Sequence, residues 1–116
     1  MVERFEVGAR LSEASAHGGL VFLAGQVATD ASQDAFGQTQ QVLQSIDRLL
    51  GQAGSHKSRI LMAQIFLADL ADFEAMNKAW DAWVVAGQPP CRATVQAKLA
   101  KPEWKVEIVV TAAKLP

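Results

Sequence analysis

The feature that most constrains this fold is a run of residues that is apolar on both faces and stands between two amphipathic helical segments. The run is Ile60–Leu67, bounded by Gly54-Ser55-His56 before it and by Asp69 after it. Strands that are apolar on both sides belong to sheets with both faces covered. The run therefore predicts a strand in such a sheet.

An amphipathic helix is predicted over residues 34–53. Asp34 suits its N-cap, and Gly51 and Gly54 suit its C-terminal end. Apolar residues recur there at three- and four-residue steps, as on one face of an α-helix. They are Phe36, Thr39, Val42, Leu43, Ile46, Leu49 and Leu50.

A second helix is predicted over residues 73–86. Asp72 suits its N-cap, and Gly87-Gln88-Pro89-Pro90 ends it, because proline cannot continue a helix. We interpret the tryptophans of its stripe as core residues rather than as a base-stacking surface. The apolar stripe comprises Phe73, Met76, Trp80, Trp83 and Val84.

Four other segments are predicted as strands. Leu20–Ala24 follows the turn signal His17-Gly18-Gly19, which suggests a hairpin with Phe5–Leu11. Residues 92–99 and 104–112 alternate in polarity, as strands do. The order is then β-β-α-β-α-β-β, an α+β fold with one sheet. Right-handed crossovers place both helices on one face of that sheet.

Two helices on one face leave the other face without cover. Because Leu20–Ala24 and Ile60–Leu67 are apolar on both faces, the second face is expected to meet another subunit. The sequence therefore predicts a homo-oligomer.

Composition excludes several classes of function. The formal net charge is −1, so no charge excess points to nucleic acid or to an anionic membrane. His17, His56 and Cys91 are the only histidines and cysteine, and their spacing fits no metal motif. No glycine-rich phosphate loop is present either. We expect no metal and no nucleotide cofactor. The charged start of the chain and the lone thiol favour a cytoplasmic protein.

The side chains best suited to binding or catalysis lie in the last quarter of the chain. Arg92 follows Pro89-Pro90-Cys91 and shares one strand face with Thr94. Glu107 lies on a following strand whose alternation can place it on that same face. An arginine and a glutamate so placed are either an ion pair at an oligomer interface or a small carboxylate-binding site. In the second case, the guanidinium grips the carboxylate and the glutamate handles a proton.

A set of short segments, in order along the chain, resembles the Rid family of reactive intermediate deaminases, also called YjgF or L-PSP. The likeness is greatest to its short, YoaB-like bacterial branch, through residues 76–87. The matching segments are Leu23-Ala24-Gly25-Gln26, Gln38–Leu43, Ile46-Asp47, Phe66–Asp69, Asp72–Asn77, Trp80, Pro90–Val95 and Lys105–Ile108.

The resemblance implies a chorismate-mutase-like fold formed by residues 1–116 as a single domain. It also implies a homotrimer with active sites in the clefts between subunits. The implied reaction is hydrolysis of reactive enamines and imines, such as 2-aminoacrylate, to 2-keto acids and ammonia. Members of the family need no cofactor for it.

The resemblance also assigns roles to individual residues. Arg92 matches the carboxylate-binding arginine, and Glu107 matches the acidic residue that positions the attacking water or moves its proton. Thr94 stands where active members have a small polar residue or cysteine beside the substrate. Asn77 matches a pocket asparagine, and Gly25 matches the backbone position near the bound carboxylate.

Two positions depart from the best-studied branch of the family. The pocket serine of that branch falls at Ala24, and its tyrosine falls near Leu11. Their lost hydroxyls favour an alternative function, a non-catalytic sensor that binds a small carboxylate in the same cleft. A ribonuclease or translation inhibitor is a third possibility, for which the sequence offers neither a histidine pair nor a basic groove. A chaperone-like role is a fourth.

Overall fold

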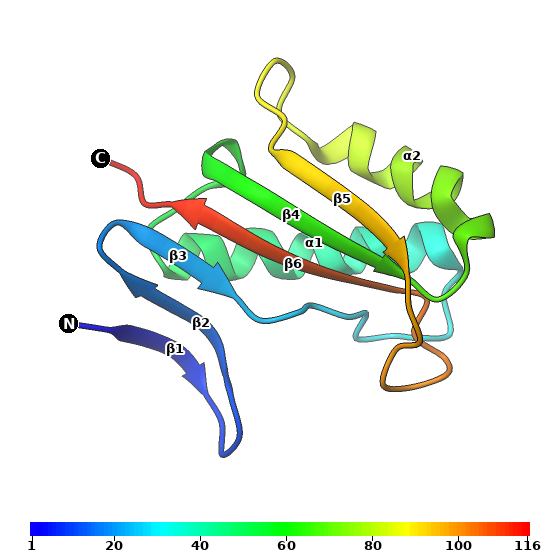
Figure 1. The fold of residues 1–116 in the computed structure, drawn as a ribbon, viewed down its shortest axis with the longest axis horizontal. Coiled ribbons are helices and arrows are strands. Elements are labelled where there is room, and N and C mark those ends of the chain that lie inside the picture. Colours follow the sequence, from blue (N-terminus) through cyan, green and yellow to red (C-terminus); the bar gives the residue numbers. More distant parts are fainter.

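Six strands form one mixed sheet, and two helices pack against one of its faces (Figure 1). This computed structural model describes all 116 residues. The strand order is β1-β2-β3-β6-β4-β5, and only β4 and β5 run parallel, with α2 in the crossover between them. The elements are β1 (Glu3–Val7), β2 (Ser12–His17), β3 (Leu20–Leu23), α1 (Ala35–Gln52), β4 (Ile60–Leu67), α2 (Phe73–Trp83), β5 (Cys91–Gln96) and β6 (Val106–Ala113).

Strand β6 shows how the pleat divides the molecule into a core side and an open side. Val106, Ile108 and Val110 are each at most 1% exposed and pack toward the helices, whereas Glu107 and Val109 point the other way and are half-buried. Alternation of this kind is typical of a sheet with one face on the core. The core thus lies between the sheet and the two helices.

The α+β class, the single sheet and the two helices on one face agree with the prediction, but the strand count does not. Three strands, rather than two, precede α1. Gly18 and Gly19 do form the predicted turn, with φ of +60° and +82°. The partner of β3 is Ser12–His17, however, and not Phe5–Leu11. Strand β2 consists of small and polar residues, so the sequence contains no apolar run that would predict it.

Element ends differ from the predicted ones by a few residues. The bounds of β4 and the Asp34 N-cap of α1 are as predicted, and the Asp34 carboxylate accepts a bond from Gly37 N–H at 2.9 Å. Helix α2 stops three residues early, at Trp83. There Val84 turns extended and Lys57 Nζ donates to the Trp83 carbonyl at 2.6 Å.

The open side of the sheet carries apolar side chains without cover from this chain. Phe22, Thr111 and Met62 are register partners on neighbouring strands and so share this face. Phe22 and Met62 are more than 40% exposed, as is Val95 on β5. The chain therefore leaves an apolar sheet face bare. None of its helices combines the length and apolar character that crossing a membrane requires.

A buried polar side chain joins α1 to the loop that follows β5. Gln38 is fully buried, and its amide nitrogen donates to the carbonyls of Ala31, Gln33 and Glu103, each at 3.1 Å. Its amide oxygen accepts the Lys105 N–H at 3.0 Å. One side chain thus satisfies four backbone groups, which would otherwise be left without partners.

Replacing Gln38 should therefore destabilise the fold. We expect Gln38→Leu to lower the free energy of unfolding by about 2–4 kcal/mol, because buried backbone groups lose their partners. Chemical denaturation measures this directly. Gln40→Leu is the matched control on an exposed position of the same helix and should change stability by less than about 0.5 kcal/mol. Equal effects of the two variants would contradict the structural role of Gln38.

Candidate functional site

Arg92 lies at the edge of the sheet, on the side that the helices cover. It is the register partner of the fully buried Ala63, and its side chain is half-buried. The guanidinium carbon is 5.3 Å from the centre of the Trp80 ring and 6.0 Å from that of Phe73. The guanidinium makes no hydrogen bond or ion pair within the chain. Its N–H groups are therefore free to bind an anion.

Thr94 and Asn77 lie on the same side as Arg92. Thr94 pairs with buried Ile65 two residues further along β5, and Asn77 is one turn of α2 from Phe73. Thr94 Oγ1 and Asn77 Oδ1 are both buried and have no hydrogen-bond partner in the chain. Buried polar atoms are rarely left so, because each carries a desolvation cost. Both oxygens therefore keep unused hydrogen-bonding capacity on the side of the sheet where Arg92 lies.

Glu107 and Gly25 form a second cluster, on the open side of the sheet. A Cβ at Gly25 would lie 2.8 Å from Cδ of Glu107, closer than carbon atoms pack. The segment is held there by two backbone bonds between Gln26 and Ile108, of 2.9 and 3.1 Å. A side chain at position 25 would therefore displace the Glu107 carboxylate from its place against the backbone.

Gln26 supports this second cluster, and the sequence did not single it out. Its side chain is buried, and Nε2 donates to Glu13 Oε1 and to the Ala24 carbonyl, both at 3.1 Å. These bonds join the end of β3 to β2 immediately before Gly25. In the sequence, Gln26 stood only as the last residue of the matching segment Leu23-Ala24-Gly25-Gln26 and was given no role. A polar residue after an apolar strand is a signal that many loop residues also give.

Arg92 and Glu107 do not share a face, so that expectation is wrong within one chain. On β4, Ala63 is the register partner of Arg92, while Phe66 is the partner of Glu107. Positions three apart on a strand point to opposite sides. The polar side of β5 is thus the one that faces the helices. The chain holds two half-sites: an arginine half-site (Arg92, Thr94, Asn77) and a glutamate half-site (Glu107, Gly25, Ala24).

The carboxyl groups with lowered pKa values lie outside both half-sites. A hydrogen bond from the Lys114 ammonium, together with its charge, lowers the pKa of Glu3. Hydrogen bonds from Ser32 lower the pKa of Asp30. Both carboxyl groups are exposed, and they bind to neighbouring loops and strand ends. They belong to the surface of the fold rather than to a reaction site.

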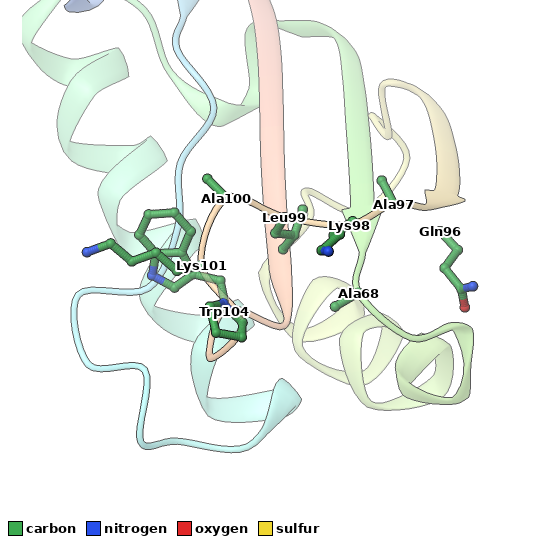
Figure 2. Close-up of a pocket in the computed structure, with 9 residues that line it drawn as sticks. Ala68, Gln96, Ala97, Lys98, Leu99, Ala100, Lys101 and Trp104 are labelled. Carbon is green, nitrogen blue, oxygen red and sulfur yellow. The ribbon is translucent and has the colours of Figure 1, made fainter.

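The largest cavity of the chain also lies apart from the site residues. It has a volume of about 690 Å³ and is lined mainly by the loop that follows β5, from Ala97 to Trp104 (Figure 2). Lys98 and Lys101 contribute to it, and no residue of either half-site does. Volume alone therefore does not locate the chemistry in a single chain.

The close approach of Gly25 to Glu107 makes a prediction about glycine replacement. Gly25→Ala should lower the free energy of unfolding by about 1 kcal/mol or less, because the new methyl group displaces the end of the flexible Glu107 side chain and no backbone atom. Gly51→Ala is the control, since a Cβ there meets nothing within 4 Å and lies in a helix. In a Glu107→Ala background the cost of Gly25→Ala should largely vanish. An undiminished cost in that background would contradict the contact.

Comparisons with known proteins identify the family. Residues 1–114 match the family model described as Endoribonuclease L-PSP. The RutC family protein YoaB of Escherichia coli is 51% identical over 112 residues, which cover 97% of each chain. A crystal structure of a YjgF-family protein from Neisseria meningitidis superposes with a TM-score of 0.98 at 46% identity. That match covers 100% of this chain and 97% of the other.

A more distant relative bears the name of an activity. The 3-aminoacrylate deaminase RutC of Acinetobacter baylyi is 37% identical over 79 residues, which cover 68% of this chain and 62% of that protein. The family match over nearly the whole sequence and the near-identical fold agree with the segments recognised in the sequence. This chain belongs to the Rid family, also called YjgF or L-PSP, and is YoaB-like.

Proposed function

We propose that this protein hydrolyses reactive 2-imino acids, such as 2-iminopropanoate formed from 2-aminoacrylate, to 2-keto acids and ammonia. The observation that carries the proposal is the pair of half-sites, each holding part of the chemistry. The arginine half-site has a free guanidinium beside unpartnered polar atoms. The glutamate half-site has a carboxylate against a bare backbone. The deaminase name of the Acinetobacter relative points to the same chemistry.

The two half-sites meet, in this proposal, between subunits. Because they face opposite sides of the sheet, no movement within one chain brings them together. A head-to-tail contact joins different surfaces of neighbouring copies, and such contacts close into rings. The uncovered apolar face, with Phe22 and Met62, supplies the surface for association. We propose a homotrimer, with residues 1–116 as one domain in each subunit.

Binding begins with the substrate carboxylate. The Arg92 guanidinium binds it through its paired N–H groups and thereby excludes amines that lack an acid group. Thr94 Oγ1 donates a hydrogen bond to the bound molecule or accepts one from it, and Asn77 Oδ1 accepts one; neither atom has a partner in the chain. The imine carbon is then held toward the second subunit's half-site.

Glu107 handles the proton in the reaction itself. An enamine first tautomerises to the imine, whose carbon is electrophilic. Water adds to that carbon, and the Glu107 carboxylate passes the proton that it takes from the water to the imine nitrogen, which gives a carbinolamine. Glu107 then takes the hydroxyl proton and passes it to the amino group. The C–N bond breaks as the C=O bond forms, and ammonia leaves behind a 2-keto acid. Because imines already hydrolyse quickly in water, a barrier lowered by a few kcal/mol is enough.

The side chains near the glutamate half-site bear on substrate choice. Ala24 adjoins Gly25, and Leu11 is 56% exposed in the turn between β1 and β2. Both are apolar, where the best-studied branch has hydroxyl groups. The alternative function is a sensor that binds a small carboxylate without turning it over. The absence of both hydroxyls favours the sensor, whereas the presence of both Arg92 and Glu107 favours the deaminase.

A coupled assay decides between deaminase and sensor. An amino-acid oxidase generates imines, and semicarbazide traps whatever imine survives. We expect the wild type to reduce semicarbazone formation and Arg92→Ala to lose that effect, because the variant cannot hold the carboxylate. Arg4→Ala, on the edge strand β1, is the matched control and should behave as wild type. If neither the wild type nor Arg92→Ala reduces semicarbazone formation although both are folded, the deaminase proposal fails. Binding of 2-keto acids to the wild type then tests the sensor function.

A mixing experiment tests the location of the site between subunits. Arg92→Ala and Glu107→Gln should each be inactive alone. When they are unfolded and refolded together at equal amounts, about one site in four should join an intact arginine half-site to an intact glutamate half-site. Activity should then return to roughly a quarter of wild type. Mixed oligomers that form but remain inactive would contradict a shared site.

The oligomeric state itself is measured by light scattering on the eluting protein. The proposal expects three times the mass of one chain at micromolar concentration. Phe22→Glu places a charge on the uncovered face and should yield the monomer. A wild type that elutes as a monomer would contradict the trimer.

A further inference from the structure

A continuous row of aromatic rings and cations runs along α2 and ends at Arg92. Lys57 Nζ lies 5.3 Å from the centre of the Trp83 ring. The Trp83 and Trp80 rings are 5.3 Å apart and tilted by 55°. Trp80 in turn lies 5.3 Å from the Arg92 guanidinium. The chain gives Arg92 no acidic or amide partner, so this ring and Phe73 are what hold its charged end.

The Trp80 ring is itself held firmly. Trp80 is only 5% exposed and belongs to the hydrophobic core. Its neighbour Trp83 is held by an indole N–H bond of 3.0 Å to Asp47 Oδ2. A ring packed in the core in this way cannot reorient without disturbing its neighbours. Trp80 is therefore a rigid surface under a side chain that has many rotatable bonds.

A guanidinium that packs on an aromatic ring keeps its N–H edge available. The attraction between cation and ring uses the flat face of the guanidinium, whereas carboxylates bind along its edge. An acidic partner would hold Arg92 equally well but would occupy that same edge. An aromatic support thus orients the arginine without competing with the substrate.

We propose that Trp80 is a positioning residue that acts through Arg92 and presents its N–H edge to the substrate carboxylate. This inference rests on the proposed function. It distinguishes Trp80, whose ring lies against the guanidinium, from Met76 and Ala79, the other buried residues of α2, which have no aromatic ring. It also predicts that binding of the substrate carboxylate depends on an aromatic ring at position 80, and not only on a side chain of that volume.

Steady-state kinetics with four variants separate the two roles. Trp80→Leu should raise KM roughly 3- to 30-fold with kcat within about twofold, because the loss affects carboxylate binding rather than the chemical step. Trp80→Phe keeps an aromatic face and should restore most of the affinity. Trp104→Leu is the control, an indole outside the row of rings that ends at Arg92. Phe73→Leu, at the longer distance, should have a smaller effect of the same kind and avoids a large change in the core.

A double-mutant cycle tests whether Trp80 acts through Arg92. In an Arg92→Lys background, Trp80→Leu should raise KM little further, because the guanidinium that the ring orients is gone. Additive effects on KM in the two backgrounds would overturn the proposal and leave Trp80 a core residue. The same outcome would follow from a Trp80→Leu variant that keeps the wild-type KM.

Two measurements that do not depend on catalytic activity test this inference separately from the deaminase proposal. The Arg92 Nε–H resonance, identified by its loss in Arg92→Lys, should be displaced by ring current to the same extent in wild type and Trp104→Leu, and clearly less in Trp80→Leu, where only the Phe73 ring remains. Titration with 2-oxobutanoate should give a Kd that follows the same order as KM. A wild type that binds the keto acid but shows no deaminase activity, with the predicted order of Kd values, overturns the deaminase proposal alone. An Arg92 resonance displaced as far in Trp80→Leu as in wild type, or Kd values that are the same in these two proteins, overturns this inference alone.

Discussion

The two-residue period of the β-pleat is the constraint on which the rest of this structure depends. It sends Val106, Ile108 and Val110 of β6 into the core and Glu107 to the opposite side. The same period, carried across β4, turns Arg92 toward the helices. Any change of register by one residue would exchange core and open faces together. The position of the half-sites is therefore as firmly determined as the core itself.

This constraint links association to chemistry. In the proposed ring, the arginine half-site of one subunit meets the glutamate half-site of the next, because a single chain holds the two on opposite sides of its sheet. The bare apolar face, proposed above as the surface for association, lies on the same side of the sheet as the glutamate half-site. Under that proposal, a monomer would leave its open face uncovered and its site incomplete.

The sequence predicted the fold class well because long periodic segments carry strong signals. Ile60–Leu67 and the Asp34 cap were found at their observed positions. The strand Ser12–His17 was missed, because its small and polar residues form no apolar run, and its burial depends on neighbours distant in sequence. For the same reason the sequence did not predict the structural roles of Gln38 and Gln26, whose buried amides bind backbone groups.

For the site, the sequence alone determined which residues have the right chemistry: an arginine, a glutamate and a glycine in segments typical of the Rid family. It could not determine which of them meet, because alternation along one strand leaves its orientation toward the core undecided. Only the tertiary structure decided that, through the register of β5 and β6 against β4. The register between strands that are distant in the chain decides which face of the sheet each side chain takes. Here it places Arg92 and Glu107 on opposite faces, and so divides the candidate site into two halves.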